Sequence, residues 1–348
     1  MKTIEIITLK ALRKIYSKLF KPKSSMYDRG IMDPDKASEQ IYNLLASGSP
    51  CMVARYGSTE MLAITNYLGV TAKHHSVWKY IQGKQFAWWW EDNVKNQMTR
   101  WSGFFPSTEE NLMRFGEMMI EDSKQLDILG SWLPDEETMI TDFNLNLTKV
   151  TLLSLEPYWS KNPWSRVLEG KKVLVIHPFA SLIEQQYKEK RGLLFDDKQV
   201  LSKFDLKTIK AVQSLGGDCE YSDWFEALDS MKKQMDATDY NIVLIGCGAY
   251  GFPLAAHAKR MGKQAIHLGG ALQLLFGIRG KRWDEPEFGA KTVCTKGGYG
   301  QLFNSYWVYP GENEKPKTAS QVEGGVLLVI FRIIMIIILT QDSVLVFL

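Results

Sequence analysis

Residues that could bind phosphate groups follow two apolar segments, each of which is predicted to form a buried strand. In the first, Arg55-Tyr-Gly57-Ser58-Thr-Glu60 comes directly after the apolar run 51–54. A guanidinium group can clamp phosphate oxygens, and a carboxylate can bind a metal ion or accept a hydrogen bond from a hydroxyl group. The structural alternative makes Ser58 an N-cap, Glu60 a first-turn acid matched to the helix dipole, and Arg55 an ion-pair partner. The spacing alone leaves both interpretations open and favours the structural one.

The second group is the glycine-rich turn Gly246-Cys-Gly248-Ala-Tyr250-Gly251, which lies between an apolar run and a helical pattern. In this context glycine backbone and a helix N-terminus can present N–H groups to phosphate oxygens. A dinucleotide site would also need an acid at the end of the next strand, where this chain has His267-Leu-Gly269-Gly270. We therefore expect a nucleotide phosphate site here in preference to an NAD site. A purely structural tight turn is the alternative.

Two histidines and several aromatic residues are further candidates. His177 and His267 both end predicted strands, which could bring them together at one sheet edge as acid–base or phosphate-binding groups. The five histidines show no zinc-site spacing with the four cysteines. Indole rings can stack on sugars, so the tryptophans of segments 88–90 and 101–106 could line a carbohydrate groove. Packing in the core is the favoured interpretation for any single one of them.

Alternating strand and helix patterns must position these groups. The apolar runs predict strands at 51–55, 126–132, 149–153, 172–176, 241–245 and 264–268. Helices are predicted at 37–47, 58–68, 107–122, 204–215, 224–235 and 253–261, and the third of these begins with a capping box at Ser107. This alternation is typical of an α/β fold with a Rossmann-like, doubly wound, mainly parallel sheet flanked by helices. We see no repeat or linker, so we expect one domain from residue 26 to residue 325.

Composition excludes some classes of protein. The chain has 348 residues, of which 45% are hydrophobic, so it can bury a core and is not globally disordered. Its 42 Lys+Arg against 39 Asp+Glu give a net charge of only +3, so we expect no nucleic-acid partner. The widely spaced cysteines indicate a reduced, cytoplasmic setting.

The first 25 residues form a basic arm. They carry seven basic side chains and one acidic side chain, a net charge of +6. Within residues 9–20 the apolar side chains fall on one helical face and the lysines on the other. Such a helix can lie on an anionic membrane, as in a protein bound peripherally to the inner face of the plasma membrane. An ordinary surface helix packed on the domain is the equal alternative.

The other end, residues 326–348, is strongly apolar. Its first run is shorter than the roughly 20 residues of a spanning helix, and Arg332 lies inside it. As a soluble strand it would be prone to aggregation.

The chain resembles the bacterial glycosyltransferases of the GT-D fold, formerly domain of unknown function 1792. Val53-Ala-Arg55-Tyr-Gly-Ser-Thr-Glu60 is similar to their Arg-Phe-Gly-Asp-Gly-Glu segment. The blocks 246–256 and 260–269 are similar to their glycine turn, the helix after it and the following Gly-x-x-Ala-x-Asp-x-Gly strand. These blocks match in order and spacing and bracket roughly 200 residues. The resemblance implies transfer of a sugar from a nucleotide-diphosphate donor, with an Asp-x-Glu pair for the diphosphate and its metal ion.

The chain departs from this pattern in its acids. Ser58 stands where the pair has Asp, so only Glu60 carries over, and His267 replaces the acid of the later strand. Fewer carboxylates weaken a site for Mg²⁺ or Mn²⁺, with Glu60 left as the metal ligand. Arg55, Lys281 and Arg282 could neutralise the diphosphate instead. We therefore interpret the chain as a divergent branch of the family.

The function expected from this resemblance is glycosyl transfer in polysaccharide or glycoprotein biosynthesis. The donor would be a nucleotide sugar, with a UDP-sugar as the first expectation, and the acceptor a glycan or glycolipid. Glu60, His177 and His267 are the catalytic candidates. The donor-binding candidates are Arg55, Gly57, Ser58, Gly246, Gly248, Tyr250, Gly251, Gly269, Gly270, Lys281 and Arg282. The alternatives are a non-catalytic nucleotide- or glycan-binding protein with a degenerate centre and, less favoured, an NAD-dependent enzyme.

The resemblance also suggests an origin for the tail. Relatives in this branch end in Val-Glu-Gly-Gly-Cys-Tyr-Trp, whereas this chain departs after Val322-Glu-Gly-Gly325. One G inserted before the codons TGT TAT TGG TAA gives GTG TTA TTG GTA, which encodes Val-Leu-Leu-Val, as at residues 326–329. We therefore expect residues 326–348 to come from a frameshift. A continuous reading frame in the resequenced gene would contradict this.

Overall fold

The computed structural model describes residues 2–20, 28–214, 220–285 and 298–311. The apolar tail and its expected frameshift lie outside these residues, as does the end of the basic arm. Within the ranges described, no helix combines the length and the hydropathy needed to cross a bilayer.

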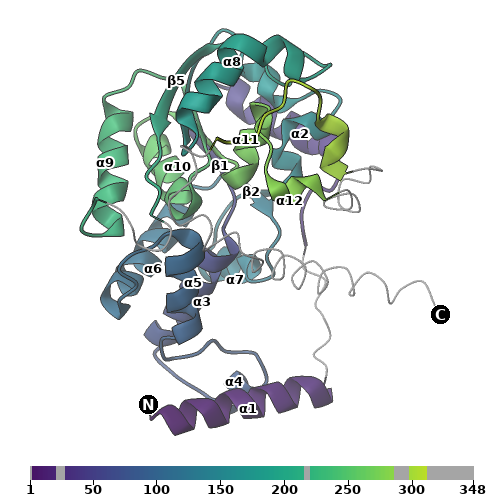
Figure 1. Cartoon of the computed structure of the whole chain (residues 1–348). Coiled ribbons are helices and arrows are strands. Elements are labelled where there is room, and N and C mark those ends of the chain that lie inside the picture. Colours follow the sequence, from purple (N-terminus) through teal and green to yellow (C-terminus); the bar gives the residue numbers. More distant parts are fainter. Residues whose placement is uncertain (1, 21–27, 215–219, 286–297, 312–348) are drawn as a thin grey trace, which may run out of the picture.

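A seven-stranded parallel sheet forms the centre of the molecule (Figure 1). Its spatial order is β3-β2-β1-β7-β6-β4-β5. In chain order the strands are β1 Cys51–Ala54, β2 Ile128–Ser131, β3 Thr148–Thr151, β4 Lys172–His177, β5 Asp205–Lys210, β6 Ile242–Ile245 and β7 Gln264–His267. From β1 the chain builds outward through β2 and β3, and it later returns from the other edge to place β7 beside β1. The expected doubly wound α/β architecture is confirmed.

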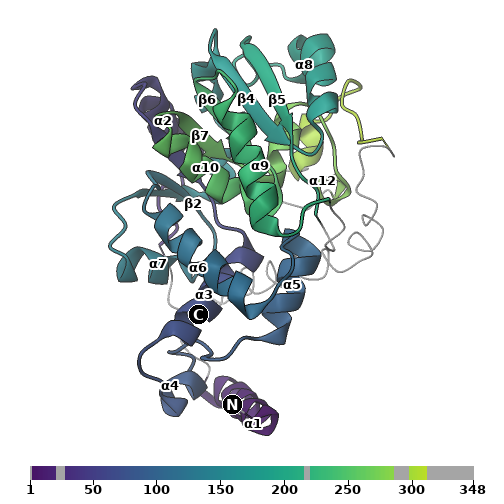
Figure 2. The same cartoon turned by 90° about the vertical axis from the view of Figure 1, so that its left-hand side faces the viewer.

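Helices cover both faces of this sheet (Figures 1 and 2). In chain order the α-helices of the described residues are α1 Thr3–Phe20, α2 Pro34–Ala46, α3 Ser58–Thr71, α4 Val77–Ile81, α5 Asp92–Ser102, α6 Glu109–Ser123, α7 Glu136–Asp142, α8 Ala180–Leu194, α9 Trp224–Asp236, α10 Gly251–Arg260, α11 Leu272–Leu275 and α12 Lys281–Asp284. Met52, Val243 and Ile245 belong to one core cluster, which includes residues of α3, α6, α9 and α10. Val53, Ile242 and Leu244 belong to a second cluster, which includes residues of α2, α8 and α11. The side chains of successive residues in a strand are therefore buried on opposite faces of the sheet.

The predicted helix over 204–215 is wrong, because Asp205–Lys210 forms the edge strand β5. All six of these residues pair in register with Lys172–His177 of β4. Thr208 and Ile209 are β-branched and suit a strand, while Lys207 and Lys210 are tolerated at an edge with one open side. Pairing with β4 decides the structure of a segment whose own pattern is ambiguous.

Two smaller corrections concern element ends. Thr108, and not Ser107, is the N-cap of α6, since its hydroxyl group accepts a hydrogen bond from the N–H of Asn111 at 3.2 Å. Ser107 instead bonds to the hydroxyl group of Thr99 at 2.8 Å. The end of the predicted strand 149–153 is also wrong, because residues 152 and 153 belong to the 3-10 turn Leu152–Leu155.

Candidate functional site

A pocket of about 270 Å³ lies at the carboxyl ends of the central strands. Residues at the ends of four strands line it, namely the segments after β1, after β2 and after β6 and the end of β7, and Arg282 from α12 joins them. Trp101, Trp132 and Phe252 give the pocket an aromatic part. Ligands bind at such crevices of open α/β sheets, where neighbouring strands connect in opposite directions.

The turn after β1 places a carboxylate in this pocket. Gly57 is the N-cap of α3 and has an extended backbone, so Ser58 is not the N-cap that the structural alternative assumed. Glu60 is only 9% exposed. A Cβ atom on residue 57 would lie 1.7 Å from Oε2 of Glu60, which shows that the carboxylate folds back onto the glycine. Glycine is therefore required here so that Glu60 can adopt this position.

Arg55 is the first positive group of the pocket. Its guanidinium carbon lies 5.0 Å from the ring centroid of Trp132, whose Nε1–H donates to the carbonyl oxygen of Tyr56 at 2.9 Å. Burial lowers the pKa of Arg55, while the negative charges of Glu60 and Glu136 raise it. In the part of the chain that the structure describes, no carboxylate oxygen lies within 4.0 Å of this guanidinium. The ion-pair role that the structural alternative gave to Arg55 is therefore not observed.

Glu136 is a buried acid whose charge acts on Arg55. Its buried carboxylate accepts hydrogen bonds from the Ser131 hydroxyl group at 2.6 Å and from the Trp132 N–H at 3.1 Å. Burial raises the pKa of Glu136 to about 7. Sequence reasoning missed this residue, because an acid just after a strand gives no sign that it will be buried.

Arg282 is the second positive group. A Cβ atom on Gly270 would lie 2.1 Å from Nη2 of Arg282, and one on Gly269 would lie 3.3 Å from Nη1 of Arg55. The two guanidinium groups thus meet at the Gly269-Gly270 turn, where Gly269 has a φ of +63°. Although Arg282 as a whole residue is exposed, enclosure of its guanidinium group lowers its pKa to about 10, and the charge of Arg55 contributes. Arg282 therefore remains protonated at neutral pH.

A buried acid also lies near Arg282. The carboxylate of Glu156 accepts hydrogen bonds from Tyr299 Oη at 2.9 Å and from Trp159 Nε1 at 2.7 Å. Burial raises the pKa of Glu156 to about 7, and the charge of Arg282 lowers it. This residue, too, was missed, because it precedes a short 3-10 turn with no recognisable motif.

The two histidines occupy different places. His267 lines the pocket, and its Nδ1 lies 3.3 Å from the carbonyl oxygen of Ile245. His177 is not on the pocket wall, and its Nδ1 accepts the N–H of Phe179 at 3.0 Å. Burial lowers the pKa of each imidazole to about 3, with the charge of Arg55 as a second cause for His267. Both rings are therefore neutral at pH 7 and are weak bases.

Only part of the glycine-rich turn reaches the pocket. Gly248, with a φ of +59°, lines the wall. Gly246 and Gly251 lie behind it, where Cβ atoms would come within 2.6 Å of the Gly269 carbonyl oxygen and within 2.1 Å of the His267 ring. Tyr250 stacks on Trp224 in the core with a centroid distance of 4.8 Å. Lys281 is exposed and lies outside the wall.

The residues present do not fit a dedicated metal site. Among the residues described, no three His, Cys, Asp or Glu side chains are placed to share an ion. Glu60 is the single carboxylate among the described residues that line the pocket, and two guanidinium groups accompany it. A hard cation needs several oxygen ligands and is repelled by neighbouring positive charges.

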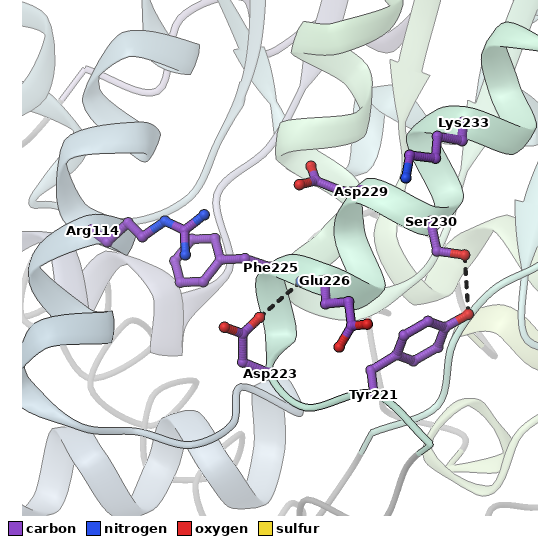
Figure 3. A pocket seen from close by; sticks show the side chains of 8 residues that line it. All are labelled: Arg114, Tyr221, Asp223, Phe225, Glu226, Asp229, Ser230 and Lys233. Carbon is purple, nitrogen blue, oxygen red and sulfur yellow. Dashed lines mark hydrogen bonds between the residues drawn. The ribbon is translucent and has the colours of Figure 1, made fainter.

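A second hollow of about 500 Å³ lies beside α9 (Figure 3). Most of its charged groups already have partners within the fold. Asp223 accepts the N–H of Glu226 at 2.8 Å, and Arg114 stacks on Phe225 with its guanidinium carbon 3.9 Å from the ring centroid. Glu226 accepts the Ser222 N–H at 2.8 Å. This hollow therefore offers a ligand fewer unsatisfied groups than the pocket at the strand ends.

Comparisons with known proteins return a small set of structures. No protein-family model and no curated protein matches the chain. A new glycosyltransferase (domain of unknown function 1792) from Streptococcus sanguinis is 12% identical with a TM-score of 0.37, covering 82% of this chain and 96% of that one. A selenomethionine-substituted structure of domain of unknown function 1792 is 11% identical with a TM-score of 0.34, covering 88% and 96%. A third, in which that domain is said to have a distinct glycosyltransferase fold, is 12% identical with a TM-score of 0.31, covering 88% and 96%.

These structural neighbours come from the family that the sequence resembles. Because identities are near 12% and TM-scores are low, no residue of the pocket takes its role from them.

Proposed function

We propose that the chain is a cytoplasmic glycosyltransferase that moves a sugar from a nucleotide-diphosphate donor, first of all a UDP-sugar, onto a surface-glycan or glycolipid acceptor. The observation that carries the proposal is the pair of guanidinium groups at the Gly269-Gly270 turn. Arg55 and Arg282 meet there without a carboxylate within 4.0 Å among the described residues. Two like charges held together in a partly enclosed pocket favour a ligand with two or more negative charges. A diphosphate has that charge.

Other residues of the pocket wall could bind the base and the sugar of such a donor. Trp101 and Trp132 offer flat apolar surfaces on which a base or a sugar ring can stack. Glu60 is buried at the same wall, where a carboxylate can accept a proton from an acceptor hydroxyl group or hydrogen-bond to the donor. The neutral imidazole of His267 can offer a hydrogen bond and is a poor base.

In the proposed reaction the acceptor oxygen bonds to the anomeric carbon, and the bond from that carbon to the diphosphate oxygen breaks. The leaving diphosphate gains negative charge in the transition state, which the two arginines stabilise. The acceptor proton passes to Glu60 when that group acts as the base. The family resemblance described above supports this reaction class.

Ligand-dependent thermal stability tests the binding step. We expect UDP-glucose or another sugar nucleotide to raise the melting temperature, and Arg55→Gln to weaken binding roughly 10- to 100-fold, as for a lost charge-assisted hydrogen bond. Arg100→Gln, at an exposed position on α5 outside the pocket wall, is the matched control. Stabilisation by NAD and by no sugar nucleotide would overturn the proposal.

Turnover separates an enzyme from a binding protein. Wild-type protein should hydrolyse a bound sugar nucleotide slowly or transfer its sugar, and Glu60→Gln should abolish this without loss of binding. Tight binding with no turnover over a panel of acceptors would favour the non-catalytic alternative, which the single carboxylate of the pocket wall also permits.

A further inference from the structure

Exposed apolar side chains gather on two helices far from the pocket. The fourteen large apolar residues that the described structure exposes include six on α1 and two on α4. The six on α1 are between 42% and 78% exposed, namely Ile4, Ile7, Leu12, Ile15, Leu19 and Phe20. On α4, Val77 is 51% and Trp78 60% exposed. Scattered exposed apolar residues are ordinary in soluble proteins, whereas a cluster of eight on adjoining helices indicates an interaction surface.

The inner side of α1 is fixed to the body of the protein. Leu9 is buried in a small cluster with Tyr80, Ala87 and Trp89. The guanidinium carbon of Arg13 lies 4.8 Å from the ring centroid of Tyr80, and Lys10 forms an ion pair with Glu91. The helix is therefore held in one orientation, which determines the side that it turns outward.

The outer side of α1 carries an apolar stripe. Ile4, Ile15 and Leu19 lie within about 60° of one another at 100° per residue, with Leu12 beside them. Figures 1 and 2 show α1 at the end of the molecule farthest from the sheet, with α4 against it. Tyr16 joins the two helices through an edge contact with Trp78, at a centroid distance of 5.8 Å. The stripe and the exposed side chains of α4 thus form one surface, here called the α1–α4 surface.

Positive charges surround the α1–α4 surface. Lys14 and Lys18 are exposed on α1 at the border of the stripe, and Lys73, Lys79 and Lys84 are exposed on and around α4. Residues 72–85 contain no acidic side chain, and α1 contains only Glu5. This charge complements a surface that is both apolar and anionic.

We propose that the α1–α4 surface lies in the headgroup region of an anionic lipid bilayer. The apolar stripe and Trp78 enter the boundary between headgroups and acyl chains, while the lysines contact lipid phosphates. A second copy of the chain fits less well, because a twofold-symmetric pairing of these surfaces would bring the two sets of lysines together. The sequence pattern indicates only the basic arm as a membrane-binding segment, whereas the structure adds α4 and shows which face of α1 points outward. This proposal does not depend on the function proposed above.

Sedimentation of the full-length protein with lipid vesicles tests the proposal. We expect binding to vesicles of equal parts phosphatidylglycerol and phosphatidylcholine, and little binding to pure phosphatidylcholine. Lys14→Gln with Lys18→Gln should weaken binding to the anionic vesicles roughly 10- to 30-fold, since each basic residue near such a surface contributes on the order of a fivefold factor. Failure to bind anionic vesicles, or equal binding to both kinds, would overturn the proposal.

Apolar substitutions separate this surface from other parts of the chain. Ile15→Ser with Leu19→Ser, and separately Trp78→Ser, should reduce binding at least fivefold while leaving the melting temperature nearly unchanged. Leu193→Ser and Met261→Ser are matched controls, because these residues are 46% and 51% exposed on other elements. Unchanged binding in the α1 and α4 variants would overturn the proposal and direct attention to other segments. Light scattering tests whether a second copy of the chain covers this surface instead. If the protein is a dimer, and the Ile15 and Leu19 substitutions dissociate it without changing lipid binding, then the surface binds a second copy and the lipid proposal is wrong.

Discussion

The substitution Gly251→Ala tests how closely α10 packs against the pocket histidine. Residue 251 begins α10 with φ −64° and ψ −41°, which alanine adopts without strain. Backbone propensity alone would therefore make the substitution stabilising, by up to about 1 kcal/mol in a helix interior. The new Cβ atom would, however, lie 2.1 Å from Cε1 and 2.3 Å from Nδ1 of His267. For an ordinary van der Waals contact, this Cβ atom and the imidazole ring would have to move apart by more than an ångström.

Neither side of this contact can move easily. His267 is 3% exposed, and its Nδ1 lies 3.3 Å from the Ile245 carbonyl oxygen. Overpacking of this kind costs about 1–3 kcal/mol. We expect Gly251→Ala to lower the free energy of unfolding by about 1–3 kcal/mol in urea titrations. Gly192→Ala in α8 should instead leave it unchanged or raise it by about 0.5 kcal/mol, because a Cβ atom there meets nothing within 4 Å.

A double-mutant cycle shows whether the histidine is the cause. In the His267→Ala background the imidazole is absent, so Gly251→Ala should cost less than about 0.5 kcal/mol, and the two substitutions should be strongly non-additive. An equal cost in both backgrounds, or a Gly251→Ala variant as stable as wild type, would refute the packing argument.

Three further predictions concern the pocket and its supports. Burial raises the pKa of Glu136 from 4.5 to about 7, so folding stability should fall as pH rises from about 4.5 to about 7, by up to roughly 3 kcal/mol. Glu136→Gln should remove this loss, which urea titrations between pH 5 and pH 8 would reveal as a flatter profile. Arg282→Lys keeps the charge but loses the planar fork, and calorimetry should show roughly tenfold weaker binding of a UDP-sugar. Trp101→Ala should weaken the same binding by roughly fivefold with little change in melting temperature, as fluorescence-monitored unfolding would check.

The central strands and the edge strand β3 could be predicted from the sequence, whereas the other edge strand, β5, could not. Every residue of β1, β6 and β7 is buried, and β1 and β6 are continuous apolar runs with one interpretation. In contrast, β5 has a single buried residue, Ile209, and its structure depends on pairing with β4. A local pattern is least ambiguous where a strand is buried on both faces, although β3 was predicted with Val150 as its one buried residue.

Several residues of the site could be predicted from the sequence, but their arrangement in space could not. Arg55 and the glycines 269 and 270 were recognisable because they come just after strands, and Glu60 was recognisable because it lies in the first turn of the helix that follows β1. Arg55 lies beside the Gly269-Gly270 turn because β1 pairs with β7. These two strands are about two hundred residues apart in the sequence, so their pairing could not be read from a local pattern. Glu136 and Glu156 could not be predicted, since the burial of an acid at the start of a helix or of a 3-10 turn depends on what packs over it.

The charge balance of the pocket also bears on metal dependence. A diphosphate that carries a divalent cation has two fewer negative charges, so it gains less from two guanidinium groups than the free diphosphate does. Further carboxylates in the pocket would offset this loss by binding the cation. Ser58 has no carboxylate, and Glu60 is the single one among the described residues of the pocket wall. Donor binding should therefore be as strong in EDTA as in Mn²⁺, whereas it should weaken in the Arg55→Gln variant under both conditions. Binding that requires Mn²⁺ would show that further oxygen ligands reach the pocket and that the two arginines do not replace the metal.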